Sequence, residues 1–196
     1  MKKLLMVGAI LALGTTMAYG DPEKATADVK VIADIVAENL VITDLNGEEI
    51  ILDFGKVSQL QKSGVSNAHE GYKVTYLGNS ISNGKLKMEL KGQDVSGNDG
   101  GAKEVMMKYQ GSVAAGEKPD KFTSVVALAE YEATMPTDKV YVGMINGTID
   151  HATTKVYVNG ATEATTGFYN NGNDGNLIDN GEYIGTLELE VTLASN

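Results

Sequence analysis

Cysteine, tryptophan and arginine are all absent from the 196-residue chain, and proline occurs only three times. Without cysteine the chain has no disulfide bond to stabilise it and no thiol for catalysis. Without arginine it lacks the forked side chain that most often contacts phosphate groups. Stability must therefore come from an apolar core alone, or from a partner that completes that core.

Positive charge is also scarce. The chain has 16 lysines against 26 aspartates and glutamates, which gives a net charge of −10. Nucleic-acid binding needs a basic surface, so this composition argues against a nucleic-acid partner. It favours instead a well-solvated acidic surface.

Residues 1–20 have the features of a secretory signal peptide. Two lysines precede a short apolar run at 4–13, and Ala18 and Gly20 place small residues at the −3 and −1 positions of a cleavage site. The run is too short for a membrane-spanning helix. We expect cleavage after Gly20 and export, leaving residues 21–196, a length suited to one domain.

Six Asn-Gly dipeptides divide the chain. Both residues tolerate the positive φ angles that type I′ hairpin turns require. The dipeptides at 46–47, 83–84 and 146–147 lie between alternating segments and predict hairpin turns. Short strands at this spacing predict an all-β fold, either a sandwich or a barrel. The expected strands are residues 29–43, 49–54, 72–77, 85–90, 104–109, 122–131, 139–145, 155–158 and 183–193.

The last expected strand, 183–193, alternates between the two faces of a sheet. Its apolar face carries Tyr183, Leu187, Leu189 and Val191, and glutamate and threonine occupy most of the other face. This period of two is typical of a strand with one buried and one solvated side.

A similar alternation begins close to the expected mature N-terminus. Acidic and basic residues occupy most of the positions between its apolar residues. An alternating segment so near a free end predicts a detachable strand. The stretch 29–43 has 15 residues, against about five or six in a usual strand, so we expect two strands in series. The apolar face of the detachable strand consists of Ala27, Val29, Val31, Ala33 and Ile35.

Four segments together resemble a known family. Residues 29–35, then 40–43, then Leu-Asp-Phe-Gly at 52–55 resemble the start of pilin subunits of the chaperone–usher route, and 181–189 resembles their closing Gly-x-Tyr-x-Gly strand. The likeness is to the major subunits of class 5 colonisation-factor fimbriae and to a related pilin-like family with a Leu-Asp-Phe-Gly element. The middle of the chain matches only in its rhythm of strands.

The resemblance implies an immunoglobulin-like β-sandwich at 36–196 that lacks its final strand. The extension 21–35 of one subunit would fill the groove of the next, with Ala27, Val29, Val31, Ala33 and Ile35 inserted. Tyr183, Leu187, Leu189 and Val191 would form one wall of that groove. The implied partners are identical or related pilin subunits, a periplasmic chaperone and an outer-membrane usher during assembly, and a host-surface ligand.

By the same resemblance the protein is a non-enzymatic subunit of a surface fimbria that supports adhesion outside the cell. The sequence also contains no nucleophile–base or phosphate-binding motif, so we assign no catalytic or cofactor-binding residue. His69 and His151 lack a second ligand at metal-binding spacing. The loop 170–182 contains Asp174 and Asp179 but does not match a calcium loop, so we expect a surface loop and no metal.

One alternative function stays open from the sequence. A secreted carbohydrate- or matrix-binding sandwich would use aromatic side chains to stack on sugars. Phe168 and Tyr169, beside the loop that begins at Asn170, are the candidates for such a platform.

Overall fold

The structure is a computed structural model that describes residues 23–29 (backbone only), 40–78, 84–95, 101–169 and 177–194. Its regular structure is almost entirely β, with antiparallel pairing throughout and one short 3-10 helix at Val158–Gly160. The all-β prediction is therefore confirmed. Within these ranges no helix has the length and apolar character needed to cross a membrane.

The smaller sheet has four strands and joins the two ends of the chain. In order across the sheet these are β1 (Glu23–Val29), β13 (Leu187–Ala194), β4 (Lys85–Lys91) and β8 (Glu132–Thr134). Leu187, Leu189, Val191 and Leu193 of β13 are all buried, while the residues between them are half-buried, so β13 has the alternation that its sequence predicts.

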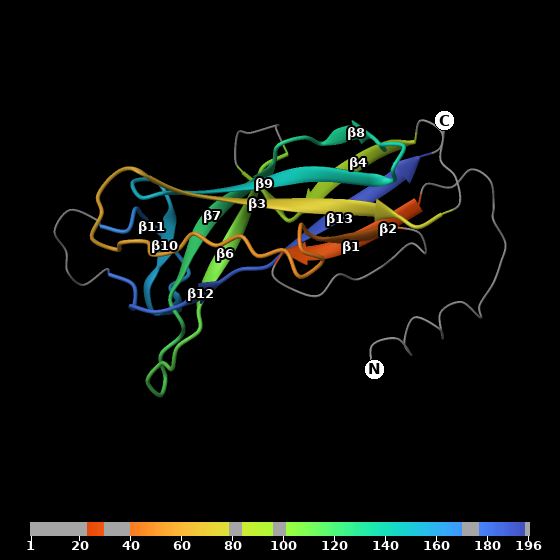
Figure 1. The fold of residues 1–196 in the computed structure, drawn as a ribbon. Coiled ribbons are helices and arrows are strands. Elements are labelled where there is room, and N and C mark those ends of the chain that lie inside the picture. Colours follow the sequence, from red (N-terminus) through yellow and green to blue (C-terminus); the bar gives the residue numbers. More distant parts are fainter. Residues whose placement is uncertain (1–22, 30–39, 79–83, 96–100, 170–176, 195–196) are drawn as a thin grey trace.

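The larger sheet has nine strands (Figure 1). Its main path runs through β11 (Thr165–Thr166), β10 (Lys155–Tyr157), β7 (Lys121–Leu128), β9 (Val140–Asp150), β3 (Val65–Tyr76) and β2 (Leu40–Asp44). On the other edge of β7 lies β6 (Lys103–Tyr109), which also pairs with β5 (Gln93–Asp94) and β12 (Tyr183–Ile184).

The two sheets share one apolar core. Tyr72, Val74 and Ile145 of the larger sheet and Met88 and Leu189 of the smaller sheet belong to the same buried cluster. A second cluster lies at the end of the molecule that carries β10 and β11, away from the C-terminal end of β13 (Figure 1). It consists of Phe122, Ile149, Val156, Phe168 and Ile178.

Two sequence predictions about local structure are wrong, and one contact explains both. Residues 51–58 form no strand, although a strand was expected at 49–54. Asn146-Gly147 forms no hairpin turn but lies inside β9. A Cβ on Gly147 would come within 2.6 Å of both Leu52 Cδ2 and Phe54 Cζ. The glycine thus admits these two side chains onto the face of β9, which explains its presence in a strand.

A turn forms at Asn46-Gly47, but the expected type I′ hairpin is wrong, because only Gly47 has a positive φ and no strand follows at 49–54. Asp44 ends β2, and its Oδ1 accepts hydrogen bonds from the backbone N–H of Asn46 at 2.9 Å and of Glu48 at 2.6 Å. These bonds, led by the one from Glu48, lower the pKa of the Asp44 carboxyl group. Gly47 follows with φ at +92°. Asn83 of the second expected turn lies outside the described residues.

Candidate functional site

The N-terminal strand β1 pairs with the closing strand β13 of the same chain. The pairing is antiparallel and places Ala25 opposite Val191, Ala27 opposite Leu189 and Val29 opposite Leu187. Residues directly opposite one another in an antiparallel pair lie on the same face of the sheet. Since these three β13 residues are buried, the register puts positions 25, 27 and 29 on the core side.

β1 lies at the border between the two sheets. It is the edge strand of the smaller sheet and also lies close to β2 of the larger one (Figure 1). Leu40 and Ile42 of β2 are buried on that side, in the same cluster as Leu189 and Val191. We call the space between β13 and β2 the groove. In this structure the chain's own N-terminal strand occupies it.

The structure brings together some of the residues that the sequence analysis names. Ala27 and Val29 lie in β1, whereas Val31, Ala33 and Ile35 lie outside the described residues. Leu187, Leu189 and Val191 all lie opposite β1.

Tyr183 lies beyond the end of the β1–β13 pairing. The expected strand 183–193 divides into β12 and β13, and Tyr183 pairs with Tyr109 of β6 in the larger sheet. Its ring centroid is 5.1 Å from that of Phe122, in the second cluster. The chain changes sheets next to Gly185, where a Cβ would come within 2.7 Å of Val105 Cγ1. Glycine at this position allows the close approach to β6.

A cavity of about 460 Å³ begins where the β1–β13 pairing ends. One wall is the irregular segment 51–59, which we call the strap, and the other is the segment 178–187. The floor comes from β6, β7 and β9 and includes Val105, Met107, Phe122, Ser124, Val126 and Ile149. Leu187 belongs both to this cavity and to the pairing with β1, so the cavity continues the line of the groove.

The strap is held by side chains rather than by its backbone. Leu52 and Phe54 pack against Gly147, and Gly55 N–H donates to Asp53 Oδ1 at 2.7 Å. Among the described residues, the backbone of 51–57 forms no hydrogen bond with another main-chain group. A segment with such free backbone groups can pair with a neighbouring strand.

One hydrogen bond joins the strap to the opposite wall. Gln59 Nε2 donates to Asn180 Oδ1 at 3.0 Å. The wall itself is held by the buried Asp120, whose Oδ2 accepts from Asp179 N–H at 2.7 Å. Tyr183 Oη donates to the Asp179 carbonyl at 2.9 Å. Burial raises the pKa of Tyr183, and the nearby carboxylates of Asp120 and Asp179 add to this effect, so its hydroxyl stays protonated at neutral pH.

The cavity combines a buried hydroxyl with an acidic rim. Ser124 is 2% exposed, and its Oγ has no hydrogen-bond partner among the residues that the structure describes. Asp53, Asp179 and Glu182 line the cavity and are exposed at its mouth. No lysine occurs among the described lining residues. The lining therefore carries three carboxylates, while the exposed Lys56 lies in the strap between the lining residues Gly55 and Val57.

Comparisons of the chain with protein-family models, with curated proteins and with solved structures find no match. The groove and the cavity are thus the basis on which function is argued.

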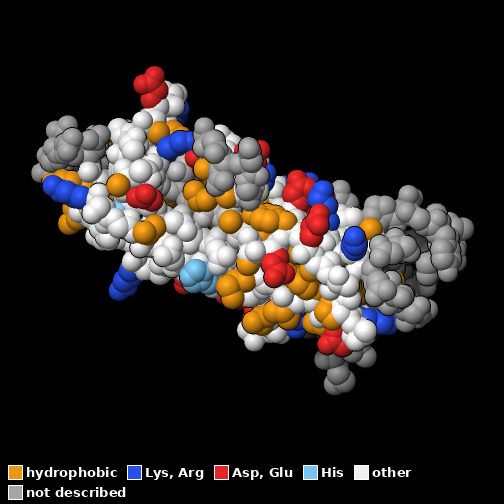
Figure 2. Space-filling model, turned by 90° about the horizontal axis from the view of Figure 1, so that it is seen from above, with side chains coloured by type: hydrophobic (Ala, Val, Ile, Leu, Met, Phe, Trp, Pro, Cys, Tyr) orange, Lys and Arg blue, Asp and Glu red, His pale blue; other side chains and the backbone are white. Residues whose placement is uncertain are grey.

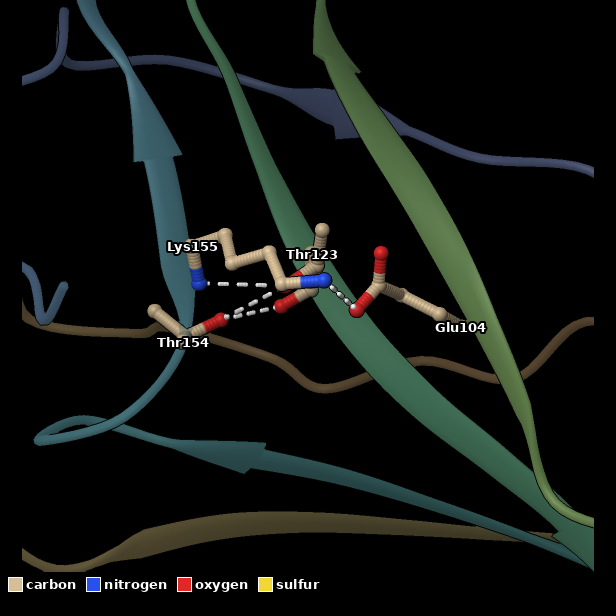
Figure 3. Close-up of polar contacts among 4 residues, drawn as sticks. All are labelled: Glu104, Thr123, Thr154 and Lys155. Atoms are coloured by element: carbon tan, nitrogen blue, oxygen red, sulfur yellow. Dashed lines mark hydrogen bonds and ion pairs between the residues drawn. The ribbon is translucent and has the colours of Figure 1, made fainter. Parts of the chain in front are cut away.

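A polar cluster that the sequence analysis missed fixes the strand that forms the cavity floor (Figure 3). Lys155 of β10 donates from Nζ to Glu104 Oε2 of β6 at 2.7 Å and from its backbone N–H to Thr123 Oγ1 of β7 at 3.1 Å. The Thr154 hydroxyl donates to the Thr123 carbonyl. Thr123 lies between Phe122 and Ser124, which both line the cavity, so the cluster holds three strands in place around it.

The two histidines considered as metal ligands each form a hydrogen bond with a side chain of the protein. His69 Nδ1 lies 2.8 Å from Asn146 Oδ1, and the buried His151 has Nε2 at 2.8 Å from Ser66 Oγ. No group of three His, Cys, Asp or Glu residues that could hold a metal occurs in the described part of the chain. Asp174 of the expected surface loop lies outside it.

The aromatic platform of the alternative function does not form. Phe168 is 2% exposed and packs edge-on against Phe122 with ring centroids 5.1 Å apart. Lys62 Nζ lies over the ring of Tyr169, 4.4 Å from its centroid. Phe168 therefore presents no open surface to a sugar, and Lys62 covers one face of Tyr169.

Apolar side chains are also exposed away from the cavity. Val142 and Met144 of β9 are 58% and 46% exposed. Seen from above the first view, hydrophobic side chains form a broken band along the middle of the molecule, with charged side chains beside it (Figure 2). Nothing in the structure indicates what would cover this band.

Proposed function

We propose that the protein is a structural subunit of a surface fibre that polymerises by donor-strand insertion. In this proposal the N-terminal strand of one copy leaves its own groove and fills the groove of the next copy. The observation that supports the proposal is the pairing of β1 with β13, in which Ala27 lies opposite Leu189 and Val29 lies opposite Leu187.

Pairing within one chain supports pairing between chains for a simple reason. The contacts that β1 makes with β13 in its own chain are the contacts that it would make in an identical neighbour, as in domain swapping. β1 is joined to β2 only through residues 30–39, so the strand can be donated without any change in the rest of the fold. A head-to-tail contact that does not close on itself produces an open filament.

The cavity supplies room for a longer donor strand. Pairing ends with Val29 opposite Leu187. If the same register continued by two residues, Val31 would lie opposite Gly185, which lines the cavity. An inserted strand would then place Val31, Ala33 and Ile35 between the strap and the segment 178–187. Backbone groups of 51–57, which pair with no other main-chain group among the described residues, would provide hydrogen bonds to it.

The energetics of such an insertion are sufficient. Each small apolar side chain that becomes buried contributes on the order of 1–2 kcal/mol, and each added ladder hydrogen bond contributes about 1 kcal/mol net. Five such side chains and several bonds are comparable to the whole stability of a domain, about 5–15 kcal/mol. The pairing of Ala27 and Val29 with β13 is the same within one chain and between chains, so the net gain on exchange would come from Val31, Ala33, Ile35 and the added bonds. In this proposal the fold of 36–196 is an incomplete immunoglobulin-like sandwich, and a donated strand completes it.

The remaining parts of the proposal rest on the resemblance to chaperone–usher pilin subunits and on the expected signal peptide. The signal peptide directs the chain out of the cytoplasm. After export, a periplasmic chaperone and an outer-membrane usher assemble it with identical or related subunits. The fibre supports adhesion to a host surface, and the subunit has no enzymatic activity of its own.

Two matched variants test the proposal. Val31→Asp places a charge on the inserted face, where burial without a partner costs several kcal/mol. Lys30→Asp changes the charge on the outward face, where it stays solvated. Electron microscopy of cells that express each variant should show fibres for Lys30→Asp and none for Val31→Asp. Fibres with both variants would reject donor-strand insertion, and a secreted binding module would then be the better account.

A further inference from the structure

The six Asn-Gly dipeptides of the chain are also the places where its covalent structure changes most readily. In this reaction the main-chain nitrogen of the glycine attacks the side-chain carbonyl carbon of the asparagine. A glycine has no Cβ to hinder the approach, and its backbone rotates more freely than that of any other residue. The asparagine side chain must be able to move, and the glycine N–H must not be held by another group. The fold therefore decides which dipeptides can react.

Asn146-Gly147 is the most restrained of the described dipeptides. It lies inside β9, and β3 and β7 pair with β9 on both sides of it. Asn146 Oδ1 lies 2.8 Å from His69 Nδ1, and Gly147 is buried. The main chain here can rotate only when the middle of the larger sheet opens.

Two further dipeptides are held by hydrogen bonds. Asn46 Nδ2 donates to Asp44 Oδ2 at 3.2 Å, and Gly47 N–H donates to the Asp44 carbonyl at 3.3 Å, so both reacting groups are restrained. Asn159 accepts at Oδ1 from Lys118 N–H at 2.8 Å. Its ψ angle of 38° also turns the next main-chain nitrogen away from its own side chain.

Asn180-Gly181 differs from these three. Both residues are exposed and lie outside the strands. Among the described residues, Gly181 N–H forms no hydrogen bond with another main-chain group. Asn180 Oδ1 accepts one bond, from the side chain of Gln59 at 3.0 Å. Asn83 and Asn171 of the other two dipeptides lie outside the described residues.

We propose that Asn180 is a site of spontaneous deamidation. The Gly181 nitrogen loses its proton and forms a bond to Asn180 Cγ, while the bond from Cγ to Nδ2 breaks and Nδ2 leaves as ammonia. Water then opens the cyclic imide at either carbonyl, which leaves aspartate or isoaspartate at position 180. One water is consumed for each ammonia released, and no oxidant or cofactor is needed. The Gln59 amide donates to Oδ1, the oxygen that gains negative charge during the attack, so this bond favours the reaction.

Peptide mass mapping of the purified exported protein measures the reaction at each dipeptide. Incubation near neutral pH in water enriched in a heavy oxygen isotope labels the product, because the second step takes its oxygen from water. The same incubation in guanidinium chloride, where the fold restrains no dipeptide, gives a reference rate for each site. In the folded protein Asn180 should react within about threefold of its reference rate, since no strand has to open there. Asn146 should react at least about tenfold more slowly than its own reference rate.

The comparison among sites decides the result. Relative to its reference rate, Asn180 should be the fastest of the four described asparagines. If Asn46, Asn146 or Asn159 equals or exceeds it, the proposal is wrong. Asn180→Gln is the matched variant, because the extra methylene group makes ring closure much slower while the amide is kept. Labelled product at 180 should disappear in this variant, and the rates at the other sites should stay the same.

A second consequence rests on the proposed function. If the register of β1 with β13 continued, Ile35 of an inserted strand would lie opposite Gly181 and restrain its main chain. Assembled fibres should then contain less product at 180 than free subunits of the same age. Equal amounts would reject the contact of the donor strand with this wall and keep the modification site. Absence of fibres, with Asn180 still the fastest of the four, would reject the fibre proposal alone.

Discussion

Val29 lies directly opposite Leu187, and it is the last residue of β1 to pair with β13. Leu187 is also a lining residue of the cavity. The end of the paired N-terminal strand therefore coincides with the start of an unfilled space between the strap and the segment 178–187. This coincidence connects the expected donor strand with the groove that it is proposed to fill.

The contact between the strap and β9 can be tested with Gly147→Ala. The added methyl group would come within 2.6 Å of Leu52 Cδ2 and Phe54 Cζ. We expect the variant to lose about 1–3 kcal/mol of unfolding free energy, as is usual for overpacking. Urea denaturation of the purified protein measures the loss.

A double variant provides the control for that measurement. Phe54→Ala makes room for the methyl group, so Gly147→Ala should cost clearly less in this background. An equal cost in both backgrounds would show that Phe54 does not limit the space at Gly147.

Acid should destabilise the protein through Asp44. The backbone N–H groups of Glu48 and Asn46 lower the pKa of its carboxyl group below the usual value of 3.8. A carboxyl group whose pKa is lower in the folded state stabilises that state above its unfolded pKa. This stabilisation disappears as pH falls below about 3.8 and through the folded value. Thermal melts between pH 7 and pH 2 should show a smaller acid-induced decrease for Asp44→Asn than for the parent.

A change of the exposed Glu163 from an acid to an amide is the control for this experiment. Glu163→Gln should melt like the parent at every pH. If Asp44→Asn also follows the parent curve, the turn after β2 does not contribute to acid sensitivity.

The cluster around Thr123 should be stabilised more by its buried hydroxyls than by its ion pair. Thr123→Val removes the acceptor for Lys155 N–H and leaves buried polar groups without a partner, which we expect to cost about 1–3 kcal/mol. Lys155→Met removes an ion pair whose lysine side chain is 44% exposed and whose Glu104 side chain is 14% exposed, and it should cost about 1 kcal/mol, because Glu104 retains contact with water. Denaturation midpoints in urea compare the two, and a larger loss for Lys155→Met would reverse this ranking.

The sequence predicts those parts of the fold that depend on local patterns. β4, β6, β10 and β13 lie where alternation or composition indicates strands, because residues on one face of a strand meet the core at every second position. Asn46-Gly47 forms a turn because its backbone preferences are local. Such features need no knowledge of the rest of the chain.

The remaining features depend on contacts between distant residues. Asn146-Gly147 has the composition of a turn, but Leu52 and Phe54 need the glycine for packing, and no local signal reveals that. The break at Gly185 depends on the approach of Val105, and the cavity depends on the course of the strap. The sequence identifies Leu187, Leu189 and Val191 as a strand face, and the family resemblance places that face beside an N-terminal strand. The register of the pairing with β1 becomes evident only in three dimensions.

Engineered cysteines measure the central claim most directly, because the chain has none of its own. Ala25 and Val191 are directly opposite in the β1–β13 pair, where Cα atoms lie about 4.5–5.5 Å apart, within reach of a disulfide bond. In a chain that carries Ala25→Cys and Val191→Cys, the bond links neighbouring subunits if the strand is donated, and closes within one chain if it is not. Ala25→Cys with Glu188→Cys is the out-of-register control, since Glu188 pairs with Asp28. Donor-strand assembly predicts a covalent ladder of exported multimers on a non-reducing gel, lost on reduction and absent from the control. Monomers with an internal disulfide as the only product would contradict it.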